Sequence, residues 1–279
     1  MKSTAFAFAR ATSIEDALHL HAEAGEGAKF IAGGQSLLAA LNFRLDEPPS
    51  LIDIGGIADL RGLTLIGDRL RIGALTRHAD VLASPLIAHH LPLIAEAMPH
   101  VAHAAIRNRG TFGGSVALAD PAAEMPACCL ALSAEMVIEG VGGTRRVAAD
   151  DFFLGMYETA LEPGELLTAV EIPLPAAQAR HGFGELARRH GDYAMAGVAM
   201  MLTPGAARVA FFGISECPVR SPAAEAAIIA GAPLQEVAAR ATEGLDIFGD
   251  PNADEDTKRH YAAVLTRRAL VRIAHRGQA

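Results

Sequence analysis

Hydrophobic and polar positions in the first part of the chain alternate first with a strand period and then with a helix period. Phe6 and Phe8 are separated by alanine, which is typical of a short strand that buries one face. The apolar positions of residues 14–21 then fall on one helical stripe, with Ser13 as N-cap and Gly25 as stop signal. The other elements predicted here are strands over 29–32 and 50–54 and a short helix over 37–41. This order indicates a small β-α-β-α-β subdomain over residues 1–56.

Residues 57–175 follow as a second subdomain in which strands alternate with short helices. Apolar runs on both sides of Gly67-Asp68, and again of Gly142-Gly143, are typical of β-hairpins. Prolines between the hairpins divide the pattern into short helices. We expect Asp120 to cap, and Pro121 to begin, a helix that ends near residue 132. The predicted strands are 63–66, 70–75, 134–139, 144–147 and 166–172.

The remainder of the chain, residues 176–279, is predicted as a smaller α+β domain. The best candidate linker is 173–182, which contains two prolines. The elements predicted beyond it are strands over 183–188, 197–202 and 208–214 and helices over 223–230, 234–243 and 256–275. Strands followed by helices favour a three-stranded sheet with helices on one face. The fold class is therefore α+β, with domains 1–175 and 176–279.

The composition indicates a globular protein that does not bind nucleic acid. Of the 279 residues, 51% are hydrophobic and 20% are charged, a balance that permits a large core. The net charge is −8, and the basic residues form no long run, whereas nucleic-acid-binding proteins normally carry a basic patch. The N-terminus lacks the apolar core of a signal peptide, and no uncharged apolar stretch reaches the ~18 residues of a membrane helix. We expect a soluble cytoplasmic protein without a transmembrane segment.

The cysteines and histidines do not predict a metal site on this chain. Cys128, Cys129 and Cys217 form no Cys-x-x-Cys motif, which excludes an obvious iron–sulfur cluster and favours buried, inert thiols. His100 and His103 have helical spacing, but the sequence shows no cysteine or carboxylate partner for them. We therefore predict that this chain binds no metal ion.

Two pairs of adjacent glycines give the clearest functional signal. One pair lies in Ile31-Ala32-Gly33-Gly34-Gln35-Ser36, and the other in Gly110-Thr111-Phe112-Gly113-Gly114-Ser115. Glycine has no Cβ, so such a pair lets the backbone turn sharply and bring its N–H groups close to a ligand. Two loops of this kind would suit a diphosphate held by backbone amides. The alternative is that both are ordinary tight turns.

Taken together, the two loops resemble those of a known flavoprotein family. Ile-Ala-Gly-Gly-Gln-Ser-Leu-Leu, then Arg-Asn-x-Gly-Thr-x-Gly-Gly-Ser and Ala-Asp-Pro-Ala-Ala, are similar to the FAD-binding medium subunit of molybdenum hydroxylases. That family includes the flavoprotein of carbon monoxide dehydrogenase and the FAD domain of xanthine dehydrogenase. The resemblance continues through residues 152–173 and 187–193 into the C-terminal part. It implies a PCMH-type FAD-binding domain of two subdomains over 1–175, and a CO dehydrogenase flavoprotein-like C-terminal domain over 176–279.

The resemblance also implies which residues would hold the FAD diphosphate. In the first loop these are the backbone at Ile31, the amides of Ala32, Gly33, Gly34 and Gln35, and the hydroxyl of Ser36. In the second segment they are Gly110, Thr111, Gly113, Gly114 and Ser115, although many relatives have asparagine where Ser115 stands. Lys29 would contribute positive charge, or it is simply a solvated lysine at a strand end.

Three further residues are implied to lie near the flavin itself. Asp120 would accept hydrogen bonds from the ribityl hydroxyls while also capping a helix. Leu161 would pack on the flavin, or it is a core leucine, and Tyr193 would shield one ring face or pack between domains. Where relatives often have a lysine that approaches the flavin, this chain has Gly184 and Glu185. A carboxylate does not stabilise the charge of a reduced flavin, so Glu185 receives no role.

The function implied by the resemblance is electron transfer within a larger enzyme. The chain would bind FAD non-covalently, since neither loop contains His or Cys, and would provide no acid, base or nucleophile. Molybdopterin would lie on a large partner subunit and two [2Fe–2S] clusters on a small one, in a dimer of heterotrimers. The external acceptor is left open among NAD, a quinone, a cytochrome and oxygen. The alternatives are a self-sufficient flavin oxidoreductase with its own substrate, and a nucleotide-binding scaffold subunit without redox function.

Overall fold

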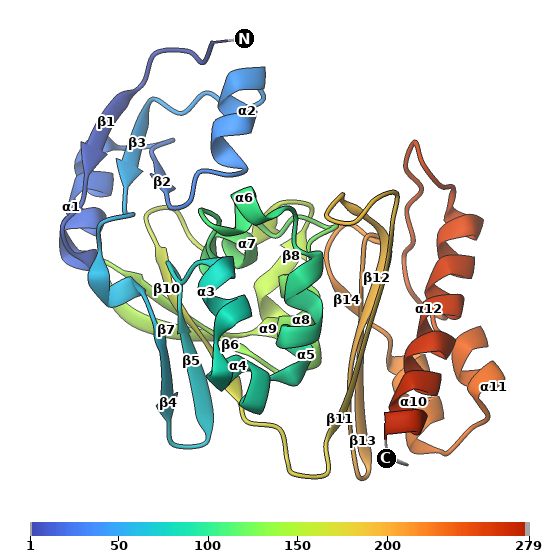
Figure 1. Ribbon diagram of the computed structural model, residues 1–279. Coiled ribbons are helices and arrows are strands. Elements are labelled where there is room, and N and C mark those ends of the chain that lie inside the picture. The colour runs from blue at the N-terminus through green and yellow to red at the C-terminus, as the bar shows by residue number, and fades with distance from the viewer. Residues whose placement is uncertain (1, 277–279) are drawn as a thin grey trace.

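Three parallel strands form the N-terminal sheet in Figure 1, a computed structural model that describes residues 2–276. The strands β1 (Ala7–Arg10), β2 (Lys29–Ile31) and β3 (Ser50–Asp53) lie in the order β1-β3-β2. Helix α1 (Ile14–Ala24) follows β1, and helix α2 (Leu37–Phe43) follows β2. β3 takes the central place and is the most buried of the three strands. The predicted β-α-β-α-β order is confirmed.

The ends of α1 are set by the residues that the sequence pattern indicated. The Ser13 hydroxyl accepts the N–H of Asp16 at 3.1 Å, which satisfies one of the unpaired donors of the first turn. Gly25 ends the helix with φ +76, a conformation that residues with a Cβ rarely adopt. The buried face of α1 is centred on Ala17, which is fully covered.

Five antiparallel strands form the middle sheet, in the order β4-β5-β10-β6-β7. The central strand β10 (Leu166–Pro173) is buried along residues 166–172, of which all but Thr168 and Glu171 are apolar. The other strands are β4 (Leu63–Ile66), β5 (Arg69–Gly73), β6 (Glu135–Gly140) and β7 (Gly143–Ala148). Both predicted hairpins and the predicted strand over 166–172 are confirmed.

Short helices occupy the chain between the strands of this sheet. Pro85 and Pro92 each stand at the first position of a helix, where a missing N–H removes no hydrogen bond. The helices are η1 (Ala58–Leu60), α3 (His78–Ala83), α4 (Pro85–His90), α5 (Pro92–Ala97), η2 (Met98–His100), α6 (Ala104–Arg107), α7 (Phe112–Leu118), α8 (Glu124–Ala131) and α9 (Ala149–Phe152). A small hairpin, β8 (Phe153–Gly155) and β9 (Glu158–Thr159), follows α9.

The second glycine pair lies in a helix, and its assignment to a loop was wrong. Gly113 and Gly114 form part of the first turn of α7, and neither has a positive φ. The Thr111 hydroxyl caps this helix by accepting the N–H of Gly114 at 3.1 Å. Glycine is required at 113 because a Cβ there would lie 2.5 Å from the Cβ of Ala74. Close packing, rather than a turn, explains this residue.

The predicted start of α8 at Asp120 and Pro121 was also wrong. The helix begins at Glu124, with Ala123 as N-cap. Residues 121–123 form a turn, and the Pro121 carbonyl accepts the N–H of Gly213 from the C-terminal domain at 2.7 Å. A long-range backbone contact thus overrides the local signal of an acidic cap followed by proline.

The C-terminal domain contains an antiparallel sheet of four strands, in the order β11-β12-β13-β14. The strands β11 (Arg180–Ala187), β12 (Ala194–Thr203) and β13 (Ala206–Phe212) confirm the three predicted strands. The short edge strand β14 (Val219–Arg220) corrects the expected number, because two residues are too few to show a strand period. The predicted helices are confirmed as α10 (Pro222–Ile229), α11 (Leu234–Ala239) and α12 (Glu255–Arg276).

The C-terminal sheet is covered on both faces, which the sequence pattern did not predict. Its own helix α12 covers one face, while α5 and α8 of the N-terminal domain cover the other (Figure 1). Along β11, a Cβ at Gly182 or Gly184 would meet α12, whereas Phe183 joins the core of the N-terminal domain. One apolar core therefore extends from Phe112 to Phe212 across both domains.

A substitution at Gly197 tests this shared core. The ring of the fully buried Phe212 lies over Gly197, and a Cβ there would be 2.0 Å from the ring Cζ. We expect Gly197→Ala to lower the free energy of unfolding by about 1–3 kcal/mol, because a close-packed core accommodates an extra methyl poorly. Urea unfolding measures the loss. Gly142→Ala, where a Cβ meets nothing within 4 Å, is the control, and equal stability of the two variants would contradict the assignment.

Candidate functional site

The two glycine-containing segments come into contact, although they are far apart in the sequence. A Cβ at Gly33 would lie 2.2 Å from the carbonyl oxygen of Arg109 and 2.9 Å from the Cα of Gly110. Only glycine permits this backbone-to-backbone approach. Gly34, with φ +70, then turns the chain towards α2. The pairing of the segments around one site, expected from their resemblance, is thus matched by direct contact.

The first loop offers a row of free backbone donors. Among residues 2–276, no acceptor receives the amide N–H of any residue from Ala32 to Ser36. Ala32, Gly33, Gly34 and Gln35 are half-buried, while Ser36 is exposed and its hydroxyl makes no cap bond. Half-buried amides that lack a partner require an acceptor from outside the chain. The loop therefore fits an anionic group such as a diphosphate.

The second segment contributes differently, because its amides are already engaged. The N–H of Gly113 donates to the Ala74 carbonyl at 2.9 Å, and that of Ser115 donates to the Thr111 carbonyl at 3.1 Å. The Gly114 N–H is taken by the Thr111 hydroxyl. A second cradle of free amides is therefore absent from this segment. Gly114 is exposed, so its bare backbone gives a ligand close access to the surface of α7.

Lys29 lies at the start of β2 and is exposed. Its Nζ forms an ion pair with Asp46 Oδ2 at 2.5 Å. Part of its charge is therefore neutralised within the protein, as expected for a solvated strand-end lysine. A contribution of Lys29 to a bound anion stays a prediction.

Asp120 is buried below an exposed tyrosine. Its Oδ1 accepts the N–H of Ala122 at 2.9 Å within the turn, and its Oδ2 accepts the hydroxyl of Tyr157 at 3.2 Å. The residue is 9% exposed, and burial raises the pKa of its carboxyl group. Asp120 thus does not cap α8, and the turn directs it towards the β8–β9 hairpin.

Tyr157 is a candidate site residue that sequence reasoning missed. It has φ +57, a strained conformation for a residue with a Cβ, and 57% of its surface is exposed despite the bond to Asp120. Burial and the Asp120 carboxylate raise the pKa of Tyr157 to about 12. Tyr193 is close enough to contribute to this shift, and is itself 75% exposed. The positive φ of Tyr157 has no local signal in the sequence, because Met156-Tyr157 contains no turn-forming residue.

Leu161 follows β9 and is half-buried. It packs against the core that both domains share, and its N–H donates to the Thr159 hydroxyl at 3.4 Å. This position agrees with its interpretation as a core leucine. Contact with a ligand stays a prediction.

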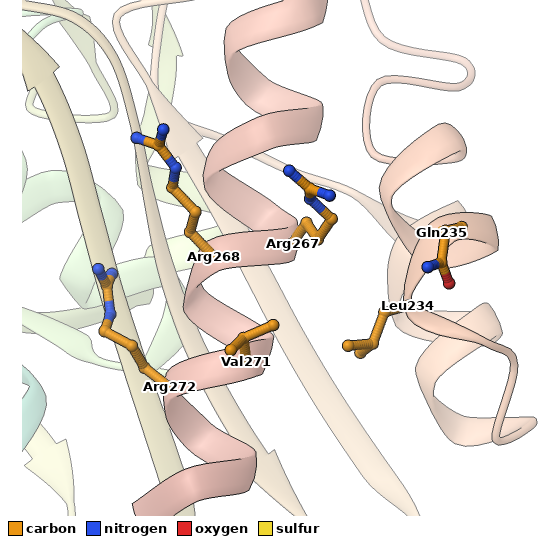
Figure 2. Close-up of a pocket in the computed structure, with 6 residues that line it drawn as sticks. All are labelled: Leu234, Gln235, Arg267, Arg268, Val271 and Arg272. Carbon is orange, nitrogen blue, oxygen red and sulfur yellow. The ribbon is translucent and has the colours of Figure 1, made fainter.

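The hollow between α11 and α12 contains none of the predicted site residues. Its volume is about 400 Å³, and its lining residues are Leu234, Gln235, Arg267, Arg268, Val271 and Arg272 (Figure 2). Arg268 and Arg272 extend on one side of α12 and Arg267 lies on the other side, so the three side chains do not converge on one ligand. The hollow lies on the helices that cover the outer face of the C-terminal sheet. It is separate from the two glycine-containing segments.

No helix within residues 2–276 is both long enough and apolar enough to cross a membrane. In the same part of the chain, no three His, Cys, Asp or Glu side chains gather in a way that could hold a metal ion.

The chain belongs to the FAD-binding medium subunits of molybdenum hydroxylases. Residues 4–175 match the family described as the FAD binding domain in molybdopterin dehydrogenase. Residues 181–273 match the family described as the CO dehydrogenase flavoprotein C-terminal domain. The chain is therefore an oxidoreductase subunit that binds FAD, and in this family other subunits carry molybdenum and the iron–sulfur clusters.

Individual relatives cover almost the whole chain. Caffeine dehydrogenase subunit beta of Pseudomonas sp. (strain CBB1) is 37% identical over 289 residues, which cover 99% of this chain and 97% of the relative. Carbon monoxide dehydrogenase from Hydrogenophaga pseudoflava superposes with a TM-score of 0.95 at 36% identity, covering 99% of both chains. Quinoline 2-oxidoreductase from Pseudomonas putida 86 gives a TM-score of 0.92 at 36% identity, again over 99% of both. The complete fold, with both domains, is therefore that of the family.

The contact at Gly33 generates a prediction for FAD binding. Gly33→Ala must separate the first loop from Arg109, which costs about 1–3 kcal/mol for a well-packed contact. Because the displaced amides are those that face the ligand, we expect the affinity for FAD to fall roughly tenfold to a hundredfold. Flavin fluorescence during titration measures the affinity, and circular dichroism checks the fold.

Gly56→Ala is the matched control for this variant. Gly56 is exposed and belongs to the same subdomain, and its added Cβ would be 3.8 Å from the nearest atom, the Ala11 carbonyl oxygen. We expect its affinity for FAD to equal that of the wild type. If Gly33→Ala also binds FAD with unchanged affinity, the contact between the two segments does not shape the site.

Proposed function

We propose that this chain holds FAD at the contact between its two subdomains and passes electrons from a partner's iron–sulfur clusters to an external acceptor. The observation that carries the proposal is the row of unpaired amides from Ala32 to Ser36, held in place by the Gly33–Arg109 contact. A diphosphate provides the anionic oxygens that such a row requires. Bound FAD would supply the redox chemistry, and the chain would provide its orientation and surroundings.

The proposed binding residues occupy three parts of the site. The first loop provides Lys29, Ile31, Ala32, Gly33, Gly34, Gln35 and Ser36. The second segment provides Gly110, Thr111, Gly113, Gly114 and Ser115, with the role of Thr111 being to fix the start of α7. Asp120, Leu161 and Tyr193 would lie along the flavin, and Tyr157 joins them through its hydrogen bond to Asp120.

The proposed assembly is a heterotrimer that pairs into a dimer of heterotrimers. The carbon monoxide dehydrogenase medium chain of Hydrogenophaga pseudoflava is 34% identical and covers 92% of this chain and 93% of the relative. A "medium chain" implies a larger and a smaller partner, and here these would carry molybdopterin and two [2Fe–2S] clusters. We also propose the domain division 1–175 and 176–279, with subdomains of about 1–56 and 57–175. The substrate would be oxidised on the large subunit.

The state of the cofactor is the first test of this function. We expect the purified protein, or its complex, to be yellow and to release FAD completely on acid precipitation, because neither binding segment contains a His or Cys that could form a covalent link. The absorbance of supernatant and pellet measures the distribution. A colourless protein that binds ADP but not FAD would support a scaffold role instead. Turnover of an organic substrate by the isolated chain would support a self-sufficient oxidoreductase.

The exposed ring of Tyr193 gives a kinetic prediction. If this ring shields one face of the flavin, Tyr193→Ala should increase the rate of flavin reoxidation by acceptor about threefold to tenfold, the scale of one aromatic contact. The rate of flavin reduction through the iron–sulfur clusters should change less, since that path does not require access from solvent. Stopped-flow spectroscopy of the complex resolves the two half-reactions. Tyr193→Phe, which retains the ring, is the control, and equal rates in all three proteins would exclude a shielding role.

A further inference from the structure

Three ionisable side chains from separate elements meet where the two domains join. Glu185 comes from β11, Glu124 from the first turn of α8, and His100 from η2. The Glu185 side chain is only 3% exposed, and its Oε2 has no hydrogen-bond partner within residues 2–276. The nearest ring nitrogen, His100 Nδ1, lies 3.7 Å away, beyond hydrogen-bond distance. His100 thus has the carboxylate neighbour that the sequence did not reveal.

No positive charge in the described chain compensates these carboxylates. Neither Glu185 nor Glu124 forms a salt bridge with a lysine or arginine among residues 2–276. Arg272, on α12, donates to the Phe183 carbonyl. Glu96, on α5, is already paired with Arg276 at 2.9 Å. A buried carboxylate without a cationic partner is stabilised in its neutral form.

The ionisation of both acids is shifted accordingly. Burial raises the pKa of Glu185 to about 8, and the charge of Glu124 adds to the shift. Burial also raises the pKa of Glu124 to about 7, and the charge of Asp120 adds to that shift. The pKa of Glu185 therefore depends on the charge of Glu124, and the pKa of Glu124 depends on the charge of Asp120. Glu124 directly follows Ala123, whose N–H donates to the Asp120 carbonyl at 3.0 Å. The electrostatic influence therefore runs from Asp120, which belongs to the proposed flavin pocket, through Glu124 to Glu185.

Solvent reaches this cluster from the side of the histidines. His100 is half-buried, and its ring centroid lies 5.6 Å from that of His190, which is exposed. Burial lowers the pKa of His100, and the nearby His190 lowers it further, so His100 is mostly neutral and its imidazole can relay a proton. The other ionisable group on β11 near this point, His181, contacts Glu96 at 3.4 Å.

We propose that the buried pair Glu185 and Glu124 takes up a proton at the domain junction and that this proton site is electrostatically coupled to the flavin pocket through Asp120. The coupling rests on the proposed function. Negative charge that accumulates in the pocket on reduction increases the affinity of the pair for a proton, and solvent supplies that proton through His190 and His100. Electrons arrive from the partner subunit and protons arrive through this chain, so the charge in the pocket is balanced.

The first experiment uses the chain without FAD and examines only the proton pair. Folding raises the pKa of Glu185 from 4.5 to about 8, so the folded state binds more protons than the unfolded state within this range. The stability of the wild type should therefore fall as the pH rises from about 4.5 to 8. Glu185→Gln should lose most of this decline, and Glu124→Gln should lose a part that ends near pH 7. Urea unfolding at a series of pH values measures the profiles.

Glu255→Gln, at the exposed start of α12, is the matched control and should follow the wild-type profile. If Glu185→Gln does not fold, infrared spectroscopy of the wild type replaces it. A protonated carboxyl band should persist at pH 7 and disappear above about pH 8. Parallel unfolding profiles for wild type and variants, or no such band, would overturn the proposal.

The second experiment uses the chain loaded with FAD and examines the coupling. The flavin reduction potential of the wild type should change slope with pH between about 7 and 8, where the pair titrates. Glu185→Gln should bind FAD with unchanged affinity but lose this change of slope. Identical potential profiles would overturn the coupling. Failure of the wild type to bind FAD would instead contradict the proposed function and leave the outcome of the first experiment standing.

Discussion

The site depends on one contact in which two backbones touch without a side chain between them. Gly33 rests on the carbonyl of Arg109, and any Cβ would overlap this oxygen. Because of this contact, the loop that follows the N-terminal three-stranded sheet is held against the segment before α7, while the amides of Ala32 to Ser36 have no acceptor within residues 2–276. A loop without this support would have to order five free amides only when the ligand binds, at a considerable entropic cost. The Gly33–Arg109 contact orders the loop during folding, so this entropic cost does not fall on ligand binding.

Similar backbone contacts fix the C-terminal domain relative to this site. A Cβ at Gly191 would lie 2.8 Å from the Ala102 carbonyl oxygen, and the Gly213 N–H donates to Pro121. The first contact positions the loop that carries Tyr193, and the second positions the turn that carries Asp120. Since one apolar core also joins the domains, these residues are held at the site by the packing of Phe183 and Phe212. The contacts that dock the two domains therefore also set the geometry of the candidate site.

Much of the fold could be predicted because its signals are local. Ser13, Gly25 and the hairpin glycines act within a few residues of where they stand, and the apolar runs are long enough to show their period. The errors arose where a distant residue decides the outcome. Asp120 and Pro121 carry every local mark of a helix start, yet Gly213 draws them into a turn. Tyr157 combines a positive φ with a hydroxyl bonded to Asp120, and no neighbour in sequence encodes that bond. The need for glycine at position 33 likewise depends on Arg109, which is distant in the sequence and which only the structure places beside it.

The role proposed for Glu185 also depends on residues that are distant in the sequence. The family resemblance implies a lysine in this region. From the sequence alone, a carboxylate is therefore unsuited to a site that accumulates negative charge. Within residues 2–276, Glu185 has no lysine or arginine partner, and burial together with the charge of Glu124 raises its pKa to about 8. A lysine offers a fixed positive charge, whereas a neutral acid pair offers a proton affinity that increases when charge arrives. Both reduce the electrostatic cost of a reduced cofactor, but only the second makes that cost depend on pH across the range in which Glu124 and Glu185 titrate.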